Sequence, residues 1–309
     1  MRVLVTGATT PFGAEIVDRL LADPAIAHVL EVGGEPGVED GPRRSYARVD
    51  LSRPRAVRDL IHGAARSAGI DAVVHASLHR RAGDEGPRVH ARNVEATREL
   101  LYACAAVPAI RRFVFASSAA VYAVRTKTPC LLDEEAPLEL DPRAPQWVRD
   151  RVEADLTVCT RMGLEPFGVV VLRCAEMLAE DVGSQLWDYL QSRVCLRPLG
   201  FDPMINVLSM ADAAGAIVLA LRGTASAVYN VGGADTLPLS RLIARWGRRD
   251  VPVPGPLLAP LYALRTRTIG LDFRYDLNRQ RFHLGGLVDD GRARRELGYR
   301  STNAIRWPA

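Results

Sequence analysis

The sequence predicts an α/β fold, a doubly wound parallel sheet with a smaller lobe towards the C-terminus. Three observations favour this fold. The chain has 309 residues, of which 48% are apolar, enough to build a sizeable core. Short β-branched runs alternate with amphipathic stretches through the first two-thirds of the chain. A glycine-containing turn joins the first of these runs to the first helical stretch.

Buried strands are expected in five runs, with helices between them. The strand runs are 3–6, 29–32, 72–75, 113–117 and 168–172. The amphipathic stretches are 14–21, 56–68 and 94–105. A repeated strand–helix order is typical of a parallel sheet that is covered on both faces, and ligands bind at the carboxyl ends of its strands. We therefore expect functional residues directly after these strands.

The C-terminal third is expected to form a second, smaller unit. Segments 176–204 and 236–309 carry more Pro, Gly and Arg, with helical pieces and no long strand run. The segment 205–235 between them looks like a return to the sheet layer. The predicted organisation is a nucleotide-binding domain of residues 1–175, completed by 205–235, and a substrate-binding lobe made of the other two pieces. Within that lobe, the apolar stretch 251–264 is interpreted as a lid over a substrate pocket rather than a membrane contact.

Composition excludes several classes of protein. The net charge is +4, and Arg residues are interspersed with acidic ones, so no nucleic-acid-binding stripe is expected. Five cysteines without a CxxC pair argue against a disulfide framework or a zinc site, and no metal is expected. The chain enters a strand at once and has no long apolar segment, which predicts a soluble, cytoplasmic protein. The GxSxG, HExxH and P-loop motifs of hydrolases and phosphoryl-transfer enzymes are missing.

The turn after the first strand has the pattern of a phosphate-binding loop. It reads Thr6-Gly7-Ala8-Thr9-Thr10-Pro11-Phe12-Gly13. Gly7 and Gly13 occupy the first and third places of a G-x-x-G-x-x-G pattern, and Thr10 takes the middle place. Glycine permits tight turning and a close approach of the backbone to pyrophosphate, while the following helix offers free N–H groups and a positive dipole. At this junction the pattern predicts a dinucleotide site.

Several later motifs extend this pattern from residue 1 to about residue 235. They are Asp50-Leu51, Val73-Val74-His75-Ala76, Asn93-Val94-Glu95-Ala96-Thr97, Ser117-Ser118-Ala119-Ala120-Val121-Tyr122 and Tyr229-Asn230-Val231-Gly232-Gly233. With the loop TGATTPFG, they resemble the extended short-chain dehydrogenase/reductases, the NAD-dependent epimerase/dehydratase group. The resemblance implies a Rossmann-type fold and an NAD or NADP cofactor.

The loop and the resemblance together imply a set of cofactor-binding residues. They are Gly7, Thr9, Thr10, Pro11, Phe12, Gly13, Gly33, Asp50, Leu51, His75, Ala76, Ser77, Asn93, Ser117 and Arg151. NAD is favoured over NADP, because Glu31 and Glu35 near the end of the second strand would repel a 2′-phosphate. Arg43 and Arg44 on the following segment keep NADP open.

The usual catalytic pair of the family is replaced. Its members generally transfer hydride with a Tyr-x-x-x-Lys pair on one helix, where this chain has Trp147 and Arg151. The only lysine, Lys127, has Ala123 four residues before it, so no shift of register restores the pair. Indole has no acidic proton to give at neutral pH. Arg151 can still hold the nicotinamide ribose, but it does not deprotonate.

The resemblance nevertheless leaves four candidate catalytic residues: Ser118, Trp147, Arg151 and Tyr122. Ser118 stands at the family's catalytic Ser/Thr position and can hydrogen-bond a carbonyl. Trp147 is expected to form an aromatic wall, and Tyr122 is a candidate displaced acid with a structural role as the alternative. The hypothesis is a ketoreductase-like oxidoreductase acting on a small, cyclic or aromatic ketone or alcohol. Its mechanism would be substrate-assisted, with Ser118 positioning the carbonyl.

Two other functions stay open on the sequence. One is a non-catalytic NAD(P)-binding or sensor protein, favoured by the loss of Tyr and Lys. The other is a nucleotide-sugar epimerase or dehydratase with an unusual proton relay, for which the lobe segment 186–203 offers only Arg193 and Arg197 as diphosphate ligands. Family members often pair through the helices that correspond to 94–105 and 152–162, so a homodimer is expected.

Overall fold

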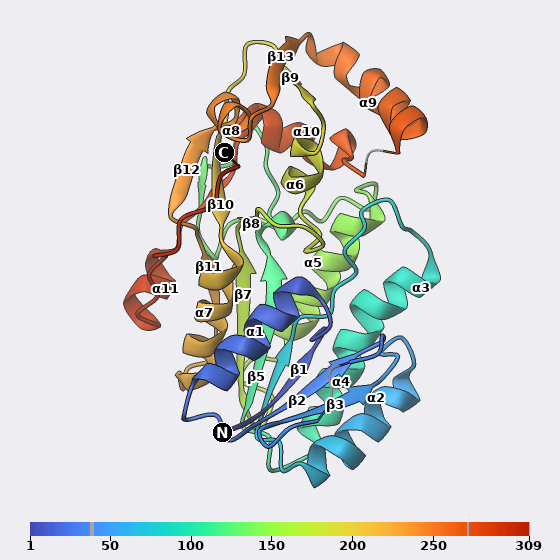
Figure 1. Cartoon of the computed structure of the whole chain (residues 1–309), viewed down its shortest axis with the longest axis vertical. Coiled ribbons are helices and arrows are strands. Elements are labelled where there is room, and N and C mark those ends of the chain that lie inside the picture. The colour runs from blue at the N-terminus through green and yellow to red at the C-terminus, as the bar shows by residue number, and fades with distance from the viewer. Residues whose placement is uncertain (38–39, 271, 309) are drawn as a thin grey trace.

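The main body is a seven-stranded parallel sheet, in a computed structural model that describes residues 1–37, 40–270 and 272–308 (Figure 1). The strand order is β11-β7-β5-β4-β1-β2-β3, and every neighbouring pair is parallel. The strands are β1 (Arg2–Thr6), β2 (His28–Gly33), β3 (Arg44–Arg48), β4 (Ala72–His75), β5 (Arg112–Ser118), β7 (Gly168–Cys174) and β11 (Ala227–Val231). All five predicted strand runs lie in this sheet, and the predicted fold class is confirmed.

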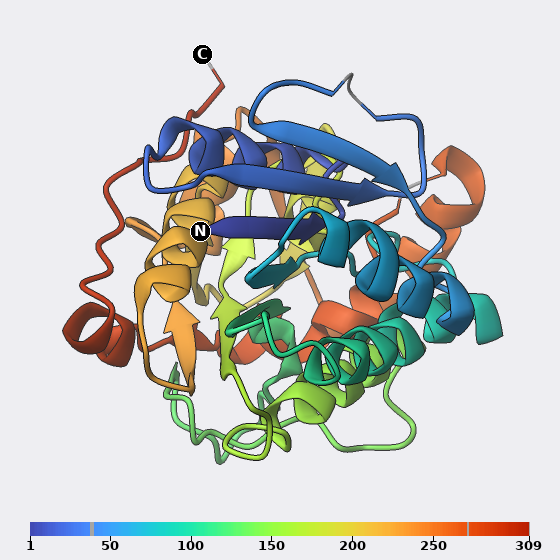
Figure 2. The same cartoon turned by 90° about the horizontal axis from the view of Figure 1, so that it is seen from below.

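Helices cover both faces of the sheet, as the view in Figure 2 shows. One face carries α1 (Pro11–Ala22) and α7 (Met210–Arg222), which pack against each other. The other face carries α2 (Pro54–Leu60), η1 (Ile61–Ala65), α3 (Pro87–His90), η2 (Ala91–Glu95), α4 (Ala96–Ala105) and α5 (Gln146–Cys159). Each face has its own apolar core, because every residue of a central strand such as β4 is buried.

The chain reverses its direction across the sheet at β1. It runs outward through β2 and β3 on one side of β1, and returns to β4 on the other side. In doubly wound sheets, ligands bind beside such a reversal, at the carboxyl ends of the strands. Gly7 follows β1 and Ala76 follows β4, so both residues lie at this edge.

Strand β3 is the element of the main sheet that sequence analysis missed. Its sequence, RSYAR, has no apolar run, and its residues are half-buried or exposed. It lies at the edge of the sheet and pairs with β2 alone. An edge strand needs less apolar surface than a central one, so its sequence carries a weaker signal.

The C-terminal lobe lies above the carboxyl ends of the sheet in Figure 1. It contains more strands than predicted, and they form small sheets of two or three strands. β12-β10-β8 form one small sheet, and β13-β9 and β14-β6 form two others. The bounds are β6 (Leu131–Leu132), β8 (Glu176–Met177), α6 (Gln185–Leu190), β9 (Val194–Pro198), β10 (Met204–Leu208), β12 (Asp235–Pro238), α8 (Leu239–Arg245), β13 (Arg249–Val253), α9 (Gly255–Ile269), α10 (Tyr275–Leu284), β14 (Leu287–Val288) and α11 (Gly291–Glu296).

The segment 205–235 is divided between the two units. Strand β11 lies in the main sheet beside β7, and α7 covers that sheet. Strand β10 instead pairs with β8 and β12 in the small sheet. The lobe has a separate core rich in aromatic rings, in which Tyr189, Tyr262, Phe273 and Phe282 contact one another.

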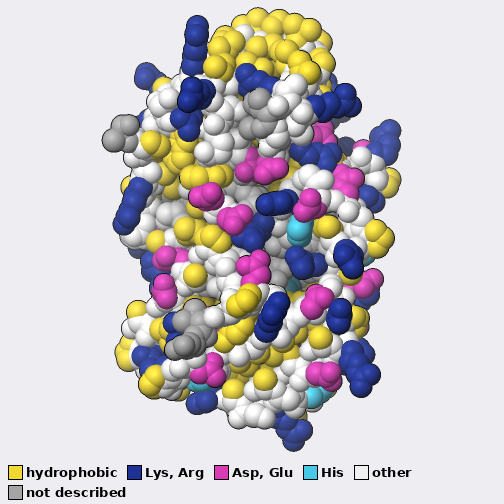
Figure 3. Space-filling model, turned by 45° about the vertical axis from the view of Figure 1, so that its right-hand side comes forward, with side chains coloured by type: hydrophobic (Ala, Val, Ile, Leu, Met, Phe, Trp, Pro, Cys, Tyr) yellow, Lys and Arg dark blue, Asp and Glu magenta, His cyan; other side chains and the backbone are white. Residues whose placement is uncertain are grey.

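The stretch 251–264, predicted to be a lid over a substrate pocket, forms the end of β13 and the first part of helix α9. It lies at the outer end of the lobe, and Figure 3 shows hydrophobic side chains gathered there. Leu257, Leu261 and Leu264 are exposed on it. Two cavities lie near Ser118, one lined by Ser118 itself and one between Ala119 and α10. None of the described residues of this stretch lines either cavity. Within the described part of the chain, no helix combines the length and apolar character needed to cross a bilayer.

Candidate active site

The phosphate loop forms the start of α1. Thr10 is the N-cap of this helix, and its Oγ1 accepts a hydrogen bond of 3.0 Å from Gly13 N. The residue that replaces the middle glycine therefore stabilises the helix end by capping it. Pro11 at the first helical position has no N–H group to offer a ligand. The dipole of α1 and the remaining free N–H groups are left for a phosphate.

Neither glycine of the loop has room for a Cβ atom, because neighbouring backbone atoms occupy that space. Gly7 has φ +74°, and a Cβ there would lie 2.8 Å from the carbonyl oxygen of Ala76. A Cβ on Gly13 would lie 2.0 Å from the carbonyl oxygen of Gly7. Side chains are excluded at both positions, so the turn presents bare backbone beside the helix N-terminus. This arrangement fits the pyrophosphate of a dinucleotide.

Other predicted cofactor residues lie at the same edge of the sheet. Ala76 and Ser77 follow β4, and their backbone contacts the Gly7 turn. Asp50 and Leu51 follow β3; Asp50 is exposed and accepts hydrogen bonds from Ser52 N and Oγ, whereas Leu51 is buried. The structure therefore brings these four residues to the side of the sheet where the phosphate loop lies.

The end of β2 lies beside a basic residue that sequence analysis missed. Gly33 ends β2 and pairs with Arg48 of β3. A Cβ on Gly33 would lie 2.8 Å from the side chain of Thr9 and 2.8 Å from the hydroxyl of Tyr46. Arg48 is exposed, and its Nε donates a 3.0 Å hydrogen bond to the carbonyl of Gly34. No sequence motif marked Arg48, because its place at this edge depends on the pairing of β3.

The roles expected for Arg43 and Arg44 are incorrect. β3 is parallel to β2 and starts with Arg44 opposite Val29, so both arginines lie at the amino end of the strands. Arg43 donates to the backbone carbonyls of Asp23 and Ile26. Arg44 forms an ion pair with Glu31 at 2.6 Å. Neither arginine is near the carboxyl edge where a 2′-phosphate would bind, and the charge of Glu31 is neutralised.

Two predicted cofactor residues, His75 and Asn93, are buried within the protein. His75 lies between the hydroxyls of Thr6 and Thr97, at 2.7 and 2.9 Å. Burial lowers the pKa of His75 to about 4, so the ring is neutral at pH 7. Asn93 accepts a hydrogen bond from His79 N and donates to Asp150. Both side chains connect β4 and the segment after it to the neighbouring helices.

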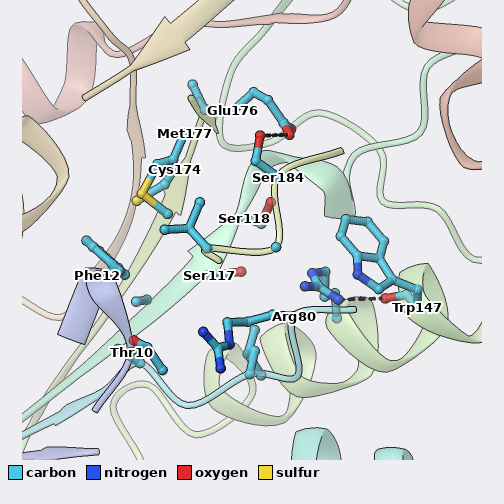
Figure 4. Close-up of a pocket in the computed structure, with 17 residues that line it drawn as sticks. Thr10, Phe12, Arg80, Ser117, Ser118, Trp147, Cys174, Glu176, Met177 and Ser184 are labelled. Carbon is cyan, nitrogen blue, oxygen red and sulfur yellow. Dashed lines mark hydrogen bonds between the residues drawn. The ribbon is translucent and has the colours of Figure 1, made fainter. Parts of the chain in front are cut away.

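A cavity opens between the phosphate loop, the end of β5 and the N-terminal half of α5. Figure 4 shows Thr10 and Phe12 on one side of it, Ser118 near its centre and Trp147 on the other side. Its lining residues are Thr10, Phe12, Ala76, Leu78, Arg80, Ala116, Ser117, Ser118, Trp147, Arg151, Cys174, Ala175, Glu176, Met177, Val182, Gly183 and Ser184. The structure thus brings Ser118, Trp147 and Arg151 together with the loop, although they lie far apart in the sequence.

Ser118 caps the short helix η3 (Ala119–Val121) that follows β5. Its Oγ accepts a 3.1 Å hydrogen bond from Ala120 N. It donates no hydrogen bond to another described residue. The acceptor side of the hydroxyl is therefore held by the backbone, and its proton is free to point to a ligand.

Trp147 and Arg151 form one stacked unit on α5. The guanidinium carbon of Arg151 lies 3.5 Å from the centroid of the indole ring. Arg151 donates only to the backbone carbonyls of Trp147 and His79, and forms no ion pair with a described residue. Burial lowers the pKa of Arg151 to about 9, and the side chain is still charged at neutral pH. The Nε1 of Trp147 is buried and, among the described residues, has no hydrogen-bond partner.

The structure does not bring Tyr122 into this cavity. Its hydroxyl donates to Asn230 Oδ1 at 2.7 Å and accepts from Arg173 Nη1 at 3.1 Å. Arg173 is also paired with Asp155 at 2.7 Å, and Ser117 donates to the same carboxylate at 2.5 Å. Burial raises the pKa of Tyr122 to about 12. This geometry matches the structural alternative for Tyr122, a buried residue that holds β5, β7, β11 and α5 together.

Comparison with known sequences finds one family and several related proteins. The model of the NAD-dependent epimerase/dehydratase family matches residues 3–148. An uncharacterised protein of Mycobacterium tuberculosis is 30% identical over 307 residues, which cover 96% of this chain and 79% of that protein. A 3-diazoavenalumate denitrifying reductase of a Streptomyces species is 29% identical, and the match covers 98% of this chain and 97% of that enzyme.

Solved structures with the same fold include a dTDP-glucose 4,6-dehydratase of Streptomyces venezuelae with NAD bound. Its TM-score is 0.72 at 21% identity, covering 99% of this chain and 93% of that one. A short-chain dehydrogenase/reductase superfamily protein of Agrobacterium tumefaciens, also with NAD bound, has a TM-score of 0.71 at 22% identity, covering 98% and 93% of the two chains.

Proposed function

The chain belongs to the NAD-dependent epimerase/dehydratase family, and we propose that it is an NAD(P)-dependent oxidoreductase working without a catalytic tyrosine. Its proposed substrate is a small ketone or alcohol with a cyclic or aromatic body. The Streptomyces relative is named as a reductase, which supports hydride transfer as the reaction.

The observation that carries this proposal is a pair of unused hydrogen-bond donors in one cavity. Ser118 and Trp147 both line the space beside the phosphate loop, and the indole N–H of Trp147 is buried without a partner among the described residues. A buried donor without a partner costs about 1–3 kcal/mol, a cost that a ligand oxygen placed there would remove. In the proposed complex both donors reach one substrate oxygen, an arrangement that stabilises negative charge developing on a carbonyl.

The bound nicotinamide would supply the hydride for reduction or accept it for oxidation. The residues of the chain hold the substrate for this transfer. Ser118 donates its hydroxyl proton in a hydrogen bond to the carbonyl oxygen, and Trp147 donates its N–H to the same oxygen while its ring borders the substrate. Arg151, stacked on Trp147, places a fixed positive charge beside the oxygen and favours negative charge there. None of these groups gives up its proton in the step.

The proton that completes the alcohol therefore comes from the substrate itself or from water. A hydroxyl of ordinary acidity is a poor proton donor, and the raised pKa of Tyr122, together with its buried position, keeps that phenol out of the reaction. The substrates best suited to such a site carry an acidic O–H that can give its proton to the alkoxide that hydride delivery creates. Phenolic and enolisable ketones have such a group, which is why we propose them as the substrate class.

We propose Arg48 as the residue that governs the choice between NAD and NADP. It lies beside Gly33 and Gly34 at the end of β2, and forms no ion pair with a described residue. The neighbouring Glu31 is neutralised by Arg44, so the repulsion expected from the sequence is weaker than predicted. The guanidinium of Arg48 is suited to a 2′-phosphate, since Arg binds phosphate oxygens through paired N–H groups.

The first experiment is native mass spectrometry of the purified protein, followed by NADH- and NADPH-dependent turnover on a panel of phenolic and enolisable ketones. We expect a retained or added dinucleotide and turnover of at least one member of the panel. Ser118→Ala should lower kcat by about a hundredfold to a thousandfold, because one donor to the developing oxyanion is lost. Ser67→Ala, at an exposed position, is the control.

Two outcomes contradict the proposal. A protein that binds neither NAD nor NADP in either redox state has no hydride to transfer. Undiminished turnover in Ser118→Ala would remove the role of Ser118 while leaving the oxidoreductase assignment in place.

A further inference from the structure

A second cavity adjoins the first around the carboxyl end of β7. Both are lined by Ala175 and Glu176, so the two cavities meet at these residues. The second cavity extends from η3, directly after Ser118, up to α10 of the lobe. Its apolar lining includes Leu186, Ile205 and Phe282, and its charged residues are Glu176 and Arg281. Sequence analysis singled out no residue of α10.

The guanidinium of Arg281 is only partly used by the protein. Its Nη2 donates to the backbone carbonyls of Ala119, at 2.6 Å, and Tyr122, at 3.5 Å. Arg281 forms no ion pair with a described residue, and its Nε and Nη1 donate to none. Gly286, with φ +113°, keeps side-chain atoms away from this place, since a Cβ there would lie 3.6 Å from Nη1 of Arg281. Nη2 of the guanidinium is therefore held by the backbone of η3 and the residue after it, and the other N–H groups are available to a ligand in the cavity.

The charges around the two cavities do not balance. Among the described residues, Arg151 and Arg281 each lack a carboxylate partner, whereas Arg80 is paired with Asp181 at 3.1 Å. Glu176 is the acidic group between the two arginines, and its Oε1 already accepts hydrogen bonds from Ser184 Oγ and Leu186 N. Burial lowers the pKa of both Arg151 and Arg281, because a charge without a partner is costly away from water. One positive charge is left in excess.

We propose that the second cavity binds the carboxylate of an anionic substrate through Arg281. One negative charge neutralises the excess, and a carboxylate matches the fork of N–H donors on a guanidinium. The apolar body of the substrate lies against Leu186, Ile205 and Phe282. Because Arg281 is hydrogen-bonded to Ala119, the neighbour of Ser118, a single small molecule spans the distance from the carboxylate to the reacting carbon. This inference rests on the proposed function and names its substrate class as a keto acid or a hydroxy acid.

The test measures binding to the dinucleotide-loaded protein by calorimetry, with benzoate as the anionic probe and benzamide as its neutral counterpart. We expect benzoate to bind more tightly than benzamide. Arg281→Gln should weaken benzoate by about tenfold to a hundredfold, because a hydrogen-bonded charge is lost, and leave benzamide unchanged. Arg281→Lys, which keeps the charge but loses the fork, should weaken benzoate by a smaller factor. Arg279→Gln, exposed on the same helix, should match the wild type.

Several results overturn the inference. The inference fails if the wild type binds no benzoate, or if wild type and Arg281→Gln bind benzoate with equal affinity. It also fails if phenyl phosphate binds more tightly than benzoate and depends on Arg281, since the cavity would then be assigned to phosphate esters. Dinucleotide affinity and thermal melting check that each variant is folded. If Arg281→Gln does not fold, Arg281→Lys decides the question, and undiminished benzoate affinity in that variant counts against the inference. Benzoate binding through Arg281 without turnover of any ketone would contradict the proposed function and leave this site standing.

Discussion

Helix α5 contributes residues to two clusters of buried polar side chains. The clusters differ in how many of their hydrogen-bond donors have a partner. In the first, Arg173 donates to both oxygens of Asp155, to the hydroxyl of Tyr122 and to the carbonyl of Glu134, while Ser117 donates to Asp155. In the second, Arg151 donates to two backbone carbonyls and Trp147 Nε1 to no described group.

The difference separates a structural cluster from one that we propose binds a ligand. Breaking a saturated buried ion pair leaves a charge without a partner, and the whole protein is destabilised. A buried donor that is already unpaired is a cost in the free protein, and a ligand that accepts its hydrogen bond removes that cost. Substitutions in the first cluster should therefore change stability, and those in the second should change binding and turnover.

The largest effect is expected for Asp155→Asn. The substitution removes the negative charge that Arg173 and Ser117 contact, and leaves a buried guanidinium unpaired. We expect a loss of about 3–5 kcal/mol in the free energy of unfolding, measured by urea denaturation. Glu153→Gln, exposed on the same helix, should change it by less than about 0.5 kcal/mol. Equal losses in the two variants would remove the distinction between the clusters.

The two arginines of β3 repeat the comparison at the edge of the sheet. Arg44 is paired with Glu31, whereas Arg48 has no ion-pair partner among the described residues. Arg48→Gln should weaken NADPH binding by about tenfold and leave NADH binding unchanged, measured by fluorescence titration. Arg66→Gln, at an exposed position outside β3, is the control, since it should leave the NADPH-to-NADH affinity ratio as in the wild type. If both variants shift this ratio equally, Arg48 is not the selective residue.

Trp147→Phe tests the second cluster with a smaller change. The ring is kept and the unpaired N–H is removed, so the stability of the free protein should stay the same or rise. Turnover should fall by about threefold to tenfold, less than in Ser118→Ala, because an indole N–H is less acidic than a hydroxyl and is therefore the weaker of the two donors. Steady-state kinetics and thermal melting of the same preparation provide both readings. A loss of stability without a loss of turnover would assign Trp147 to the structural cluster.

Asp188 on α6 extends the comparison to a half-buried acid. Burial, with the nearby charges of Asp272, Glu176 and Asp181, raises the pKa of Asp188 from 3.8 to about 7. Between these two values the folded protein binds more protons than the unfolded chain, so stability falls as pH rises. Asp188→Asn should flatten this fall, measured as the free energy of unfolding at pH 5 and pH 8. An unchanged slope would show that Asp188 titrates normally.

The sequence alone determined the fold class and the glycine turn between β1 and α1. The β-branched runs, the amphipathic stretches and the glycines of the phosphate loop act locally: a buried strand needs apolar residues on both faces, and a turn without room for Cβ atoms needs Gly7 and Gly13. Such signals lie within a few neighbouring residues and can be recognised without knowing the rest of the structure. Ser118 was identified in the same way, from a motif of adjacent residues.

Only the tertiary structure decided which polar side chains have partners. The unpaired N–H of Trp147, the open guanidinium of Arg281 and the place of Arg48 beside Gly33 depend on segments that are distant in the chain. For the same reason Arg43 and Arg44 proved to lie at the wrong end of their strand, and residues 251–264 proved to lie outside the cavities beside Ser118. Spacing along a sequence specifies which residues share a helix face or a strand edge, but the distance between two elements is set by how they pack.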